Sequence, residues 1–136
     1  MVENVAPTQT WEALEANADA HLVDVRTDVE WNFVGLPELN ATGKKVVLIP
    51  WQVYPTMQRN SSFEQALSDA GLTADHTIYF ICRSGARSMA AAEAALAAGF
   101  PRVFNVADGF EGPPDMQGHR GTTSGWKADG LPWRQR

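Results

Sequence analysis

Short apolar runs that alternate with helical segments constrain the fold of this chain more than any other feature. Branched and aromatic residues gather at 21–26, 44–54, 76–82 and 102–109. Helical patterns occupy 7–19, 27–35, 60–71 and 87–99. Apolar strands separated by helices indicate right-handed crossovers and a parallel sheet that is covered on both faces. We therefore expect an α/β fold.

The length of 136 residues fits one compact domain, and the chain has neither an internal repeat nor a linker. We expect residues 1–136 to form a single domain. From Gly109 onward the sequence is typical of a loop and is too long for a simple connection between two elements. This segment is a candidate for a functional role.

Charge and composition exclude several classes of partner. The 11 basic and 16 acidic residues give a net charge of −5, which opposes binding to nucleic-acid backbones or to anionic lipids. The first twenty residues do not resemble a signal peptide, and no apolar run is long enough to cross a bilayer. We expect a cytoplasmic protein with no nucleic-acid or membrane partner. Three dispersed histidines and one cysteine lack metal-ligand spacing, so we expect no metal.

The single cysteine, Cys82, stands where the strand at 76–82 ends and an alanine-rich helix begins. Parallel sheets bind ligands beyond the carboxyl ends of their strands. Helix amides, the helix dipole and neighbouring arginines all favour a thiolate over a thiol. Gly85 permits a tight turn, so the amides of residues 83–88 can surround an anion that Arg87 closes off with its charged fork.

A free cysteine is also commonly a small buried hydrophobic residue with no chemistry. The segment RSGAR that follows Cys82 favours the functional interpretation, because an inert thiol does not require two arginines and a glycine beside it. The two interpretations predict different surroundings for the sulfur: apolar side chains for an inert thiol, and hydrogen-bond donors and positive charge for a nucleophile.

Four segments of the chain resemble the rhodanese-like sulfurtransferases. CRSGARS, from Cys82 to Ser88, matches the active-site pattern C-R-S-G-x-R-S of that family. LVDVRTDVEW resembles its D-V-R-x-x-x-E-[WF] segment, AGFPRVFNVADGF its G-[FY]-x-x-V-x-N-[LV]-x-G-G element, and WKADGLPW its W-x-x-x-G-L-P end. The segments stand in the expected order and span about Thr10 to Trp133.

The resemblance implies a single rhodanese domain with about five parallel strands and helices on both faces. It further implies that Cys82 takes sulfane sulfur from a donor such as thiosulfate and becomes a persulfide. The acceptor would be a thiol, cyanide or a carrier protein, and neither a metal nor an organic cofactor would take part. The residues that would bind the substrate are Arg83, Ser84, Gly85, Ala86, Arg87 and Ser88.

Several residues depart from the family pattern or have roles that the sequence leaves open. Asp108 replaces the first glycine of the G-G pair, and VGLPELN lacks the histidine that is common there. Residues 113–125 form an apparent insertion near the active-site rim, where His119 and Arg120 either contact substrate or belong to a surface loop. For Asp24, Arg26 and Glu30 we expect a structural ion-pair network beside the Cys82 loop.

Two other functions share parts of this signature. Phosphatases and arsenate reductases use the pattern C-x-x-x-x-x-R, but the position of that arginine holds Ser88 here, and Arg87 comes one residue early. A non-catalytic module that binds a partner or senses oxidants would keep the fold without the chemistry.

Overall fold

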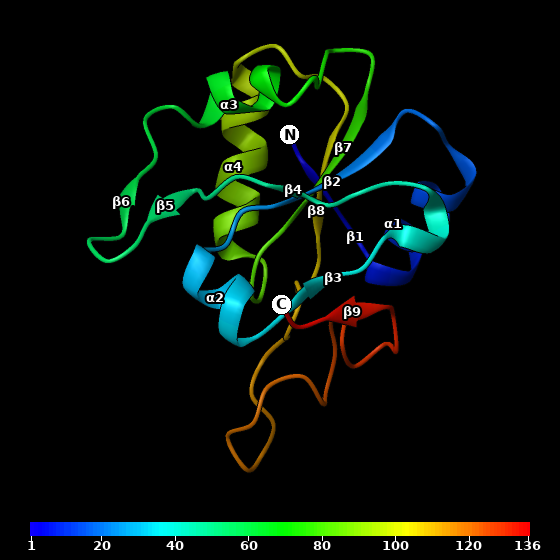
Figure 1. The fold of residues 1–136 in the computed structure, drawn as a ribbon, viewed down its shortest axis with the longest axis vertical. Helices are drawn as coiled ribbons and strands as arrows, with labels where there is room; N and C mark the ends of the chain where they lie inside the picture. Colours follow the sequence, from blue (N-terminus) through cyan, green and yellow to red (C-terminus); the bar gives the residue numbers. More distant parts are fainter.

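The computed structural model describes residues 1–136 and is built around one five-stranded sheet in which every pairing is parallel. The strand order is β1-β8-β7-β2-β4 (Figure 1). The strands are β1 (Glu3–Val5), β2 (Ala20–Asp24), β4 (Val47–Leu48), β7 (Thr77–Ile81) and β8 (Val103–Val106). The expected parallel α/β architecture is confirmed.

Helices cover both faces of this sheet (Figure 1). They are α1 (Pro7–Ala16), α2 (Asp28–Phe33), the short 3-10 turn η1 (Asn40–Thr42), α3 (Phe63–Asp69) and α4 (Ala86–Ala97). Side chains of β7 alternate between two apolar clusters: Ile78 and Phe80 pack with α3 and α4, whereas Tyr79 and Ile81 pack on the face that α1 covers. No helix has both the length and the apolar character needed to cross a membrane.

Two strand predictions need correction. The run at 44–54 forms only the two-residue strand β4 in the sheet, and its end joins a separate hairpin of β5 (Gln52–Val53) and β6 (Gln58–Arg59). Pro50 lies between the two strands and cannot donate a ladder hydrogen bond, which accounts for the break.

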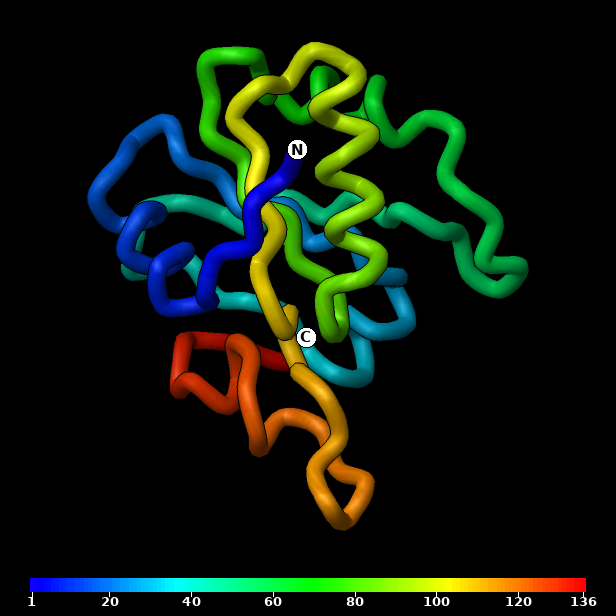
Figure 2. Tube along the Cα trace, turned by 180° about the vertical axis from the view of Figure 1, so that it is seen from behind, coloured from blue at the N-terminus to red at the C-terminus, as the bar shows by residue number.

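The edge strand β1, beside β8 in Figure 2, was not predicted, because three residues with one apolar side chain facing inward carry no periodic signal.

The segment after β8 is mostly irregular, as expected, but it is firmly attached at both ends. Trp126 is fully buried, and its indole N–H donates to the carbonyl of Pro132 over 2.7 Å. Strand β9 (Trp133–Arg134) then pairs antiparallel with β3 (Leu36–Pro37). Before these anchors, residues 113–121 extend beyond the rest of the molecule, as both ribbon and tube views show (Figures 1 and 2).

Candidate active site

Cys82 lies between the end of β7 and the start of α4, at the carboxyl edge of the sheet. The turn is made by Gly85, the residue before α4, whose φ of 115° lies in the region that favours glycine. The Gly85 amide donates to the Cys82 sulfur over 3.1 Å, and the hydroxyl oxygen of Ser88 lies 3.2 Å from the same atom. Two polar groups from the loop therefore face the sulfur.

Residues 110–112, which follow β8, hold this loop in place through three backbone hydrogen bonds. The carbonyl of Cys82 accepts from the amide of Phe110 over 2.8 Å, and the carbonyl of Arg83 accepts from the amides of Glu111 and Gly112. A Cβ atom on Gly109 would collide with the Cys82 carbonyl oxygen and the Arg83 backbone. Because these carbonyls face residues 110–112, the opposite side of the turn is left for N–H groups, and the Gly85 amide faces the sulfur.

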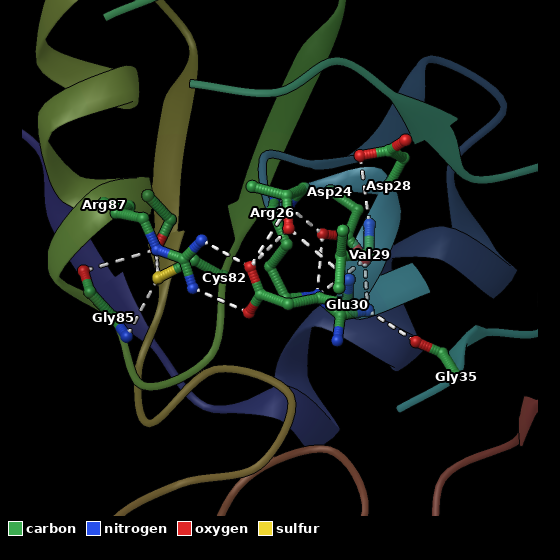
Figure 3. Close-up of polar contacts among 11 residues, drawn as sticks. Asp24, Arg26, Asp28, Val29, Glu30, Gly35, Cys82, Gly85 and Arg87 are labelled. Carbon is green, nitrogen blue, oxygen red and sulfur yellow. Dashed lines mark hydrogen bonds and ion pairs between the residues drawn. The ribbon is translucent and has the colours of Figure 1, made fainter. Parts of the chain in front are cut away.

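Arg87 does not close the loop with its fork as predicted. Its guanidinium instead pairs with both carboxylate oxygens of Glu30, over 2.7 and 2.9 Å, and lies beside the Cys82 sulfur (Figure 3). Glu30 is presented by the first turn of α2, where Thr27 caps the helix by accepting from the Glu30 amide. A bidentate charged pair outcompetes weaker acceptors, which explains the orientation of Arg87.

The ion pair shifts the pKa of both partners. Burial raises the pKa of Glu30, but the hydrogen bonds and charge of Arg87 outweigh burial, so the pKa lies below the ordinary value of 4.5. Hydrogen bonding to Glu30 raises the pKa of Arg87 against the lowering effect of burial, and the negative charges of Glu30 and Asp24 add to the rise. The pair therefore remains charged throughout the physiological range.

The expected network of Asp24, Arg26 and Glu30 divides into two separate pairs. Asp24 and Arg26 are both fully buried, and the Arg26 guanidinium donates to the Asp24 carboxylate over 2.7 Å and to the carbonyl of Gly35 over 2.8 Å (Figure 3). Its central carbon also lies 4.3 Å from the ring centroid of Phe110. Glu30 pairs with Arg87 from α4 instead, a partner 57 residues away that the sequence does not indicate.

The remaining predicted residues differ in how deeply they are buried. Arg83, Ser84 and Ala86 are exposed, whereas Ser88 is buried. The backbone amides of residues 86–88 have no acceptor within the protein, as is usual in the first turn of a helix. They are available to an anion.

His119 and Arg120 make no hydrogen bond to the Cys82 loop. His119 is exposed, and the Arg120 guanidinium donates to the carbonyl of Gly112 over 2.7 Å at the base of the 113–121 segment. No group of three or more histidine, cysteine, aspartate or glutamate side chains is placed to hold a metal ion.

Sequence reasoning missed Asn105, which is buried on β8 behind the loop. Its side-chain oxygen lies 2.5 Å from the Ser88 hydroxyl oxygen, and its side-chain nitrogen donates to the side chain of Asn4 and to the carbonyl of Gly85. An amide at a buried position of an otherwise apolar strand was the available signal, because buried polar groups need partners.

The surroundings of the Cys82 sulfur combine features of an inert buried thiol with features of a nucleophile. The residue is only 1% exposed and belongs to the apolar cluster beneath α3 and α4, as an inert thiol would. The Gly85 amide, the Ser88 hydroxyl and the nearby Arg87 are features of a nucleophile.

Comparison with known proteins gives full-length matches. A family model described as the STR4 middle domain matches residues 3–136. RP600 of Rickettsia prowazekii is 37% identical over 135 residues, and the match covers 98% of each chain. The crystal structure of Rv0390 from M. tuberculosis superimposes with a TM-score of 0.90 at 45% identity, over 99% of this chain and 98% of that chain.

Two more distant structures share the fold. The polysulfide-sulfur transferase homodimer from Wolinella succinogenes matches with a TM-score of 0.65 at 21% identity, over 99% of this chain and 80% of that chain. A rhodanese-like domain protein from Staphylococcus aureus matches with a TM-score of 0.58 at 21% identity, over 96% of this chain and 97% of that chain.

Proposed function

Because the chain belongs to the STR4 middle-domain family and has the rhodanese-like fold, we propose that it transfers sulfane sulfur through a persulfide on Cys82. Residues 1–136 then act as one rhodanese domain. The donor is a small sulfur compound of the thiosulfate type, and the acceptor is a thiol, cyanide or a carrier protein.

The observation that carries this proposal is the pair of polar groups facing the buried sulfur. The Gly85 amide at 3.1 Å, and the Ser88 hydroxyl at 3.2 Å when its proton points to the sulfur, can stabilise negative charge on a thiolate and on a persulfide. Arg87 adds a positive charge beside the sulfur that its partner Glu30 does not fully cancel. An inert core thiol would need none of these groups.

The chemistry requires two displacement steps. In the first, the Cys82 thiolate attacks the outer sulfur of thiosulfate, a new S–S bond forms, and sulfite leaves with the electron pair of the old bond. In the second, the acceptor attacks the outer sulfur of the persulfide, and the Cys82 thiolate is regenerated. No net oxidation or reduction of the protein takes place.

Substrate binding falls to the residues around this sulfur. The exposed Arg83, Ser84 and Ala86 form the outer surface of the loop, and the acceptor-free amides of residues 86–88 attract the anionic part of the donor. Since Cys82 is only 1% exposed, the donor reaches the sulfur when the loop or the Arg87–Glu30 pair moves aside. We therefore expect transfer to depend on how easily this pair opens.

Mass spectrometry of the intact protein tests the proposal. The purified protein is treated with thiosulfate or with polysulfide, and we expect a gain of one sulfur atom that cyanide or dithiothreitol removes. Cys82→Ala and Cys82→Ser should show no gain. An unchanged mass of the wild-type protein with both donors would contradict the proposed function.

The burial of Cys82 favours one alternative, a module that uses the rhodanese fold to bind a partner without thiol chemistry. This alternative predicts that Cys82 stays unmodified by sulfur donors. A module that senses oxidants instead needs an accessible thiol, and hydrogen peroxide would oxidise its Cys82 to the sulfenic acid, which a dimedone adduct reveals. The same mass measurement separates the two functions.

A further inference from the structure

Ser88 has one hydroxyl proton and three acceptors within reach. Its oxygen lies 3.2 Å from the Cys82 sulfur, 3.2 Å from the carbonyl oxygen of Gly85 and 2.5 Å from the side-chain oxygen of Asn105. The Gly85 carbonyl also accepts from the Met89 amide, so it does not need this proton. The proton is therefore shared between the sulfur and Asn105.

The distance to Asn105 decides where the proton lies. Two oxygen atoms 2.5 Å apart require a proton between them, and the amide oxygen of asparagine has none to give. In the observed arrangement Ser88 thus donates to Asn105 and offers only a lone pair to the sulfur. This arrangement fits the neutral thiol, which can donate its own proton to Ser88.

A thiolate or a persulfide needs the opposite arrangement, because a charged sulfur accepts hydrogen bonds. If the Asn105 amide turns over, its nitrogen donates to the Ser88 oxygen, and Ser88 can then donate to the sulfur. The turn costs the hydrogen bond from the Asn105 nitrogen to the Gly85 carbonyl, which keeps the Met89 amide as a donor. The Asn105 oxygen would then face Asn4, whose amide currently accepts from Asn105 over 2.8 Å and can turn in the same way. Asn4 is exposed at the start of the sheet's edge strand, so its turning is unhindered by packing.

We propose that Asn105 is a positioning residue whose amide orientation selects the state of the Cys82 sulfur that Ser88 supports. With its oxygen toward Ser88 the site holds a thiol, and with its nitrogen toward Ser88 the site holds a thiolate or persulfide. This inference rests on the proposed function for its biological meaning, but the thiolate can be measured without any sulfur donor.

The other charged groups around the sulfur are fixed by their own partners. Arg87 comes from α4 and pairs with Glu30 from α2, while Asp24 at the end of β2 pairs with Arg26. Asp108, beyond Asn105 on the same segment, is exposed. Substitutions at Asn105 leave all of these pairs intact, so changes in thiolate reactivity can be assigned to Ser88 and its proton.

The test is the rate of iodoacetamide alkylation of Cys82 between pH 5 and 9, followed by mass. Asn105→Asp supplies an acceptor that cannot donate at neutral pH, so it should keep the Ser88 proton away from the sulfur and slow alkylation at pH 7 about tenfold. Asn105→Ala removes the competing acceptor, and its rate at pH 7 should equal or exceed that of the wild type. Ser88→Ala should slow alkylation, and Ser88→Thr should restore it.

The double variant Ser88→Ala/Asn105→Asp separates proton placement from simple charge repulsion. If Asn105 acts through the Ser88 hydroxyl, the aspartate should slow alkylation far less in the Ser88→Ala background than in the wild type. An equal slowing in both backgrounds, or equal effects of the alanine and aspartate variants, would overturn the inference. Should Asn105→Asp fail to fold, Asn4→Asp at the exposed end of β1 carries the same test, because its carboxylate holds the Asn105 nitrogen away from Ser88.

The two proposals fail separately. Sulfur gain in the wild type without the alkylation pattern would reject the role of Asn105 alone. The alkylation pattern without sulfur gain from any donor would reject sulfur transfer alone and leave Asn105 as the residue that controls the reactivity of a thiol sensor.

Discussion

Gly109 shows how closely the end of β8 approaches the Cys82 loop. Any side chain at this position would collide with the carbonyl of Cys82 and the backbone of Arg83. Asp108 takes the place of the glycine common just before it in the family, and its φ of 64° is tolerable for an aspartate. The essential glycine of the pair is therefore the second one.

We expect Gly109→Ala to destabilise the protein strongly and to change the rate of alkylation of Cys82, because the Cys82 loop must move away from residue 109. Gly118→Ala is the matched control: its φ of 79° is similarly positive, but no atom lies near its absent Cβ. The control should cost about 1 kcal/mol from backbone strain alone. Urea unfolding monitored by tryptophan fluorescence measures the stability of both variants. Similar losses of stability would contradict the idea that the close contact between Gly109 and the Cys82 loop requires a glycine.

Glu30 provides a prediction about pH. Its depressed pKa means that the ion pair with Arg87 stabilises the folded state fully at pH values well above 4.5, the ordinary value, and loses this contribution as the pH falls through the folded-state pKa. Glu30→Gln keeps the capping oxygen but removes the charge, so it should cost about 1–2 kcal/mol at pH 7. The difference from the wild type should shrink as the pH falls below 4.5 and through the folded-state pKa of Glu30.

Glu38→Gln serves as the comparison for this measurement, because the Glu38–Arg134 pair is also a single ion pair but its arginine is 54% exposed. Surface pairs contribute little. A Glu38→Gln loss as large as that of Glu30→Gln, or a Glu30→Gln difference that persists at low pH, would refute the assignment.

At the residue level, the sequence predicted that Cys82 follows a strand and that Gly85 makes the turn before the next helix, but not the partners of Arg87 or Ser88. The Arg87–Glu30 pair joins residues 57 positions apart and the Asn105–Asn4 bond residues 101 positions apart. Local patterns cannot specify such contacts, because they arise only when β1, β8 and α2 are assembled around the loop.

Among the elements, α2 is short and depends on its cap. Thr27 and Glu30 form a reciprocal capping box at its start, and this helix presents Glu30 to Arg87. The sequence predicted a helical pattern from residue 27, and the helix begins at Asp28 with Thr27 as its cap. The positions of α3, α4, β2, β7 and β8 were likewise readable from apolar periodicity and from the glycines that end the helices.

Thr27→Ala should destabilise the protein by about 1 kcal/mol and weaken the Arg87–Glu30 pair. Ser62→Ala is a matched control, since Ser62 occupies the same position before α3 but its side chain makes no capping hydrogen bond. Chemical denaturation should show almost no change for the control. Equal losses of unfolding free energy for the two variants would show that the Thr27 capping hydrogen bond does not stabilise the protein.

For the whole molecule, the segment after β8 has two parts: residues 126–134 pack against the domain, and residues 113–121 extend away from it. The Gly121 amide donates to the Glu111 carbonyl over 2.6 Å, so the 113–121 segment is closed at its base. Within it, the side chain of Asp115 accepts from the amides of Gln117 and His119 and from the hydroxyl of Thr122. These hydrogen bonds join residues 115–122 to one another and make no contact with the Cys82 loop.

Deletion of residues 114–119 should therefore leave the melting temperature within about 4 °C of the wild type, because a short turn can join Pro113 to Arg120. The rate of sulfur transfer to cyanide should be unchanged. Trp126→Ala, in the anchored part of the same segment, should cost about 3–5 kcal/mol. A loss of transfer to cyanide in the deletion variant would show that the excursion contacts the small substrates.

The placement of β1 also bears on how the chain is made. This first strand has only one neighbour, β8, so it has nothing to pair with until residue 106 has been synthesised. During translation the growing polypeptide can assemble β2, β4 and β7 while its leading end waits, and Asn4 reaches Asn105 only in the final stage. A ribosome stalled before β8 should thus display a folded centre with an amino-terminal tail that proteases still cut.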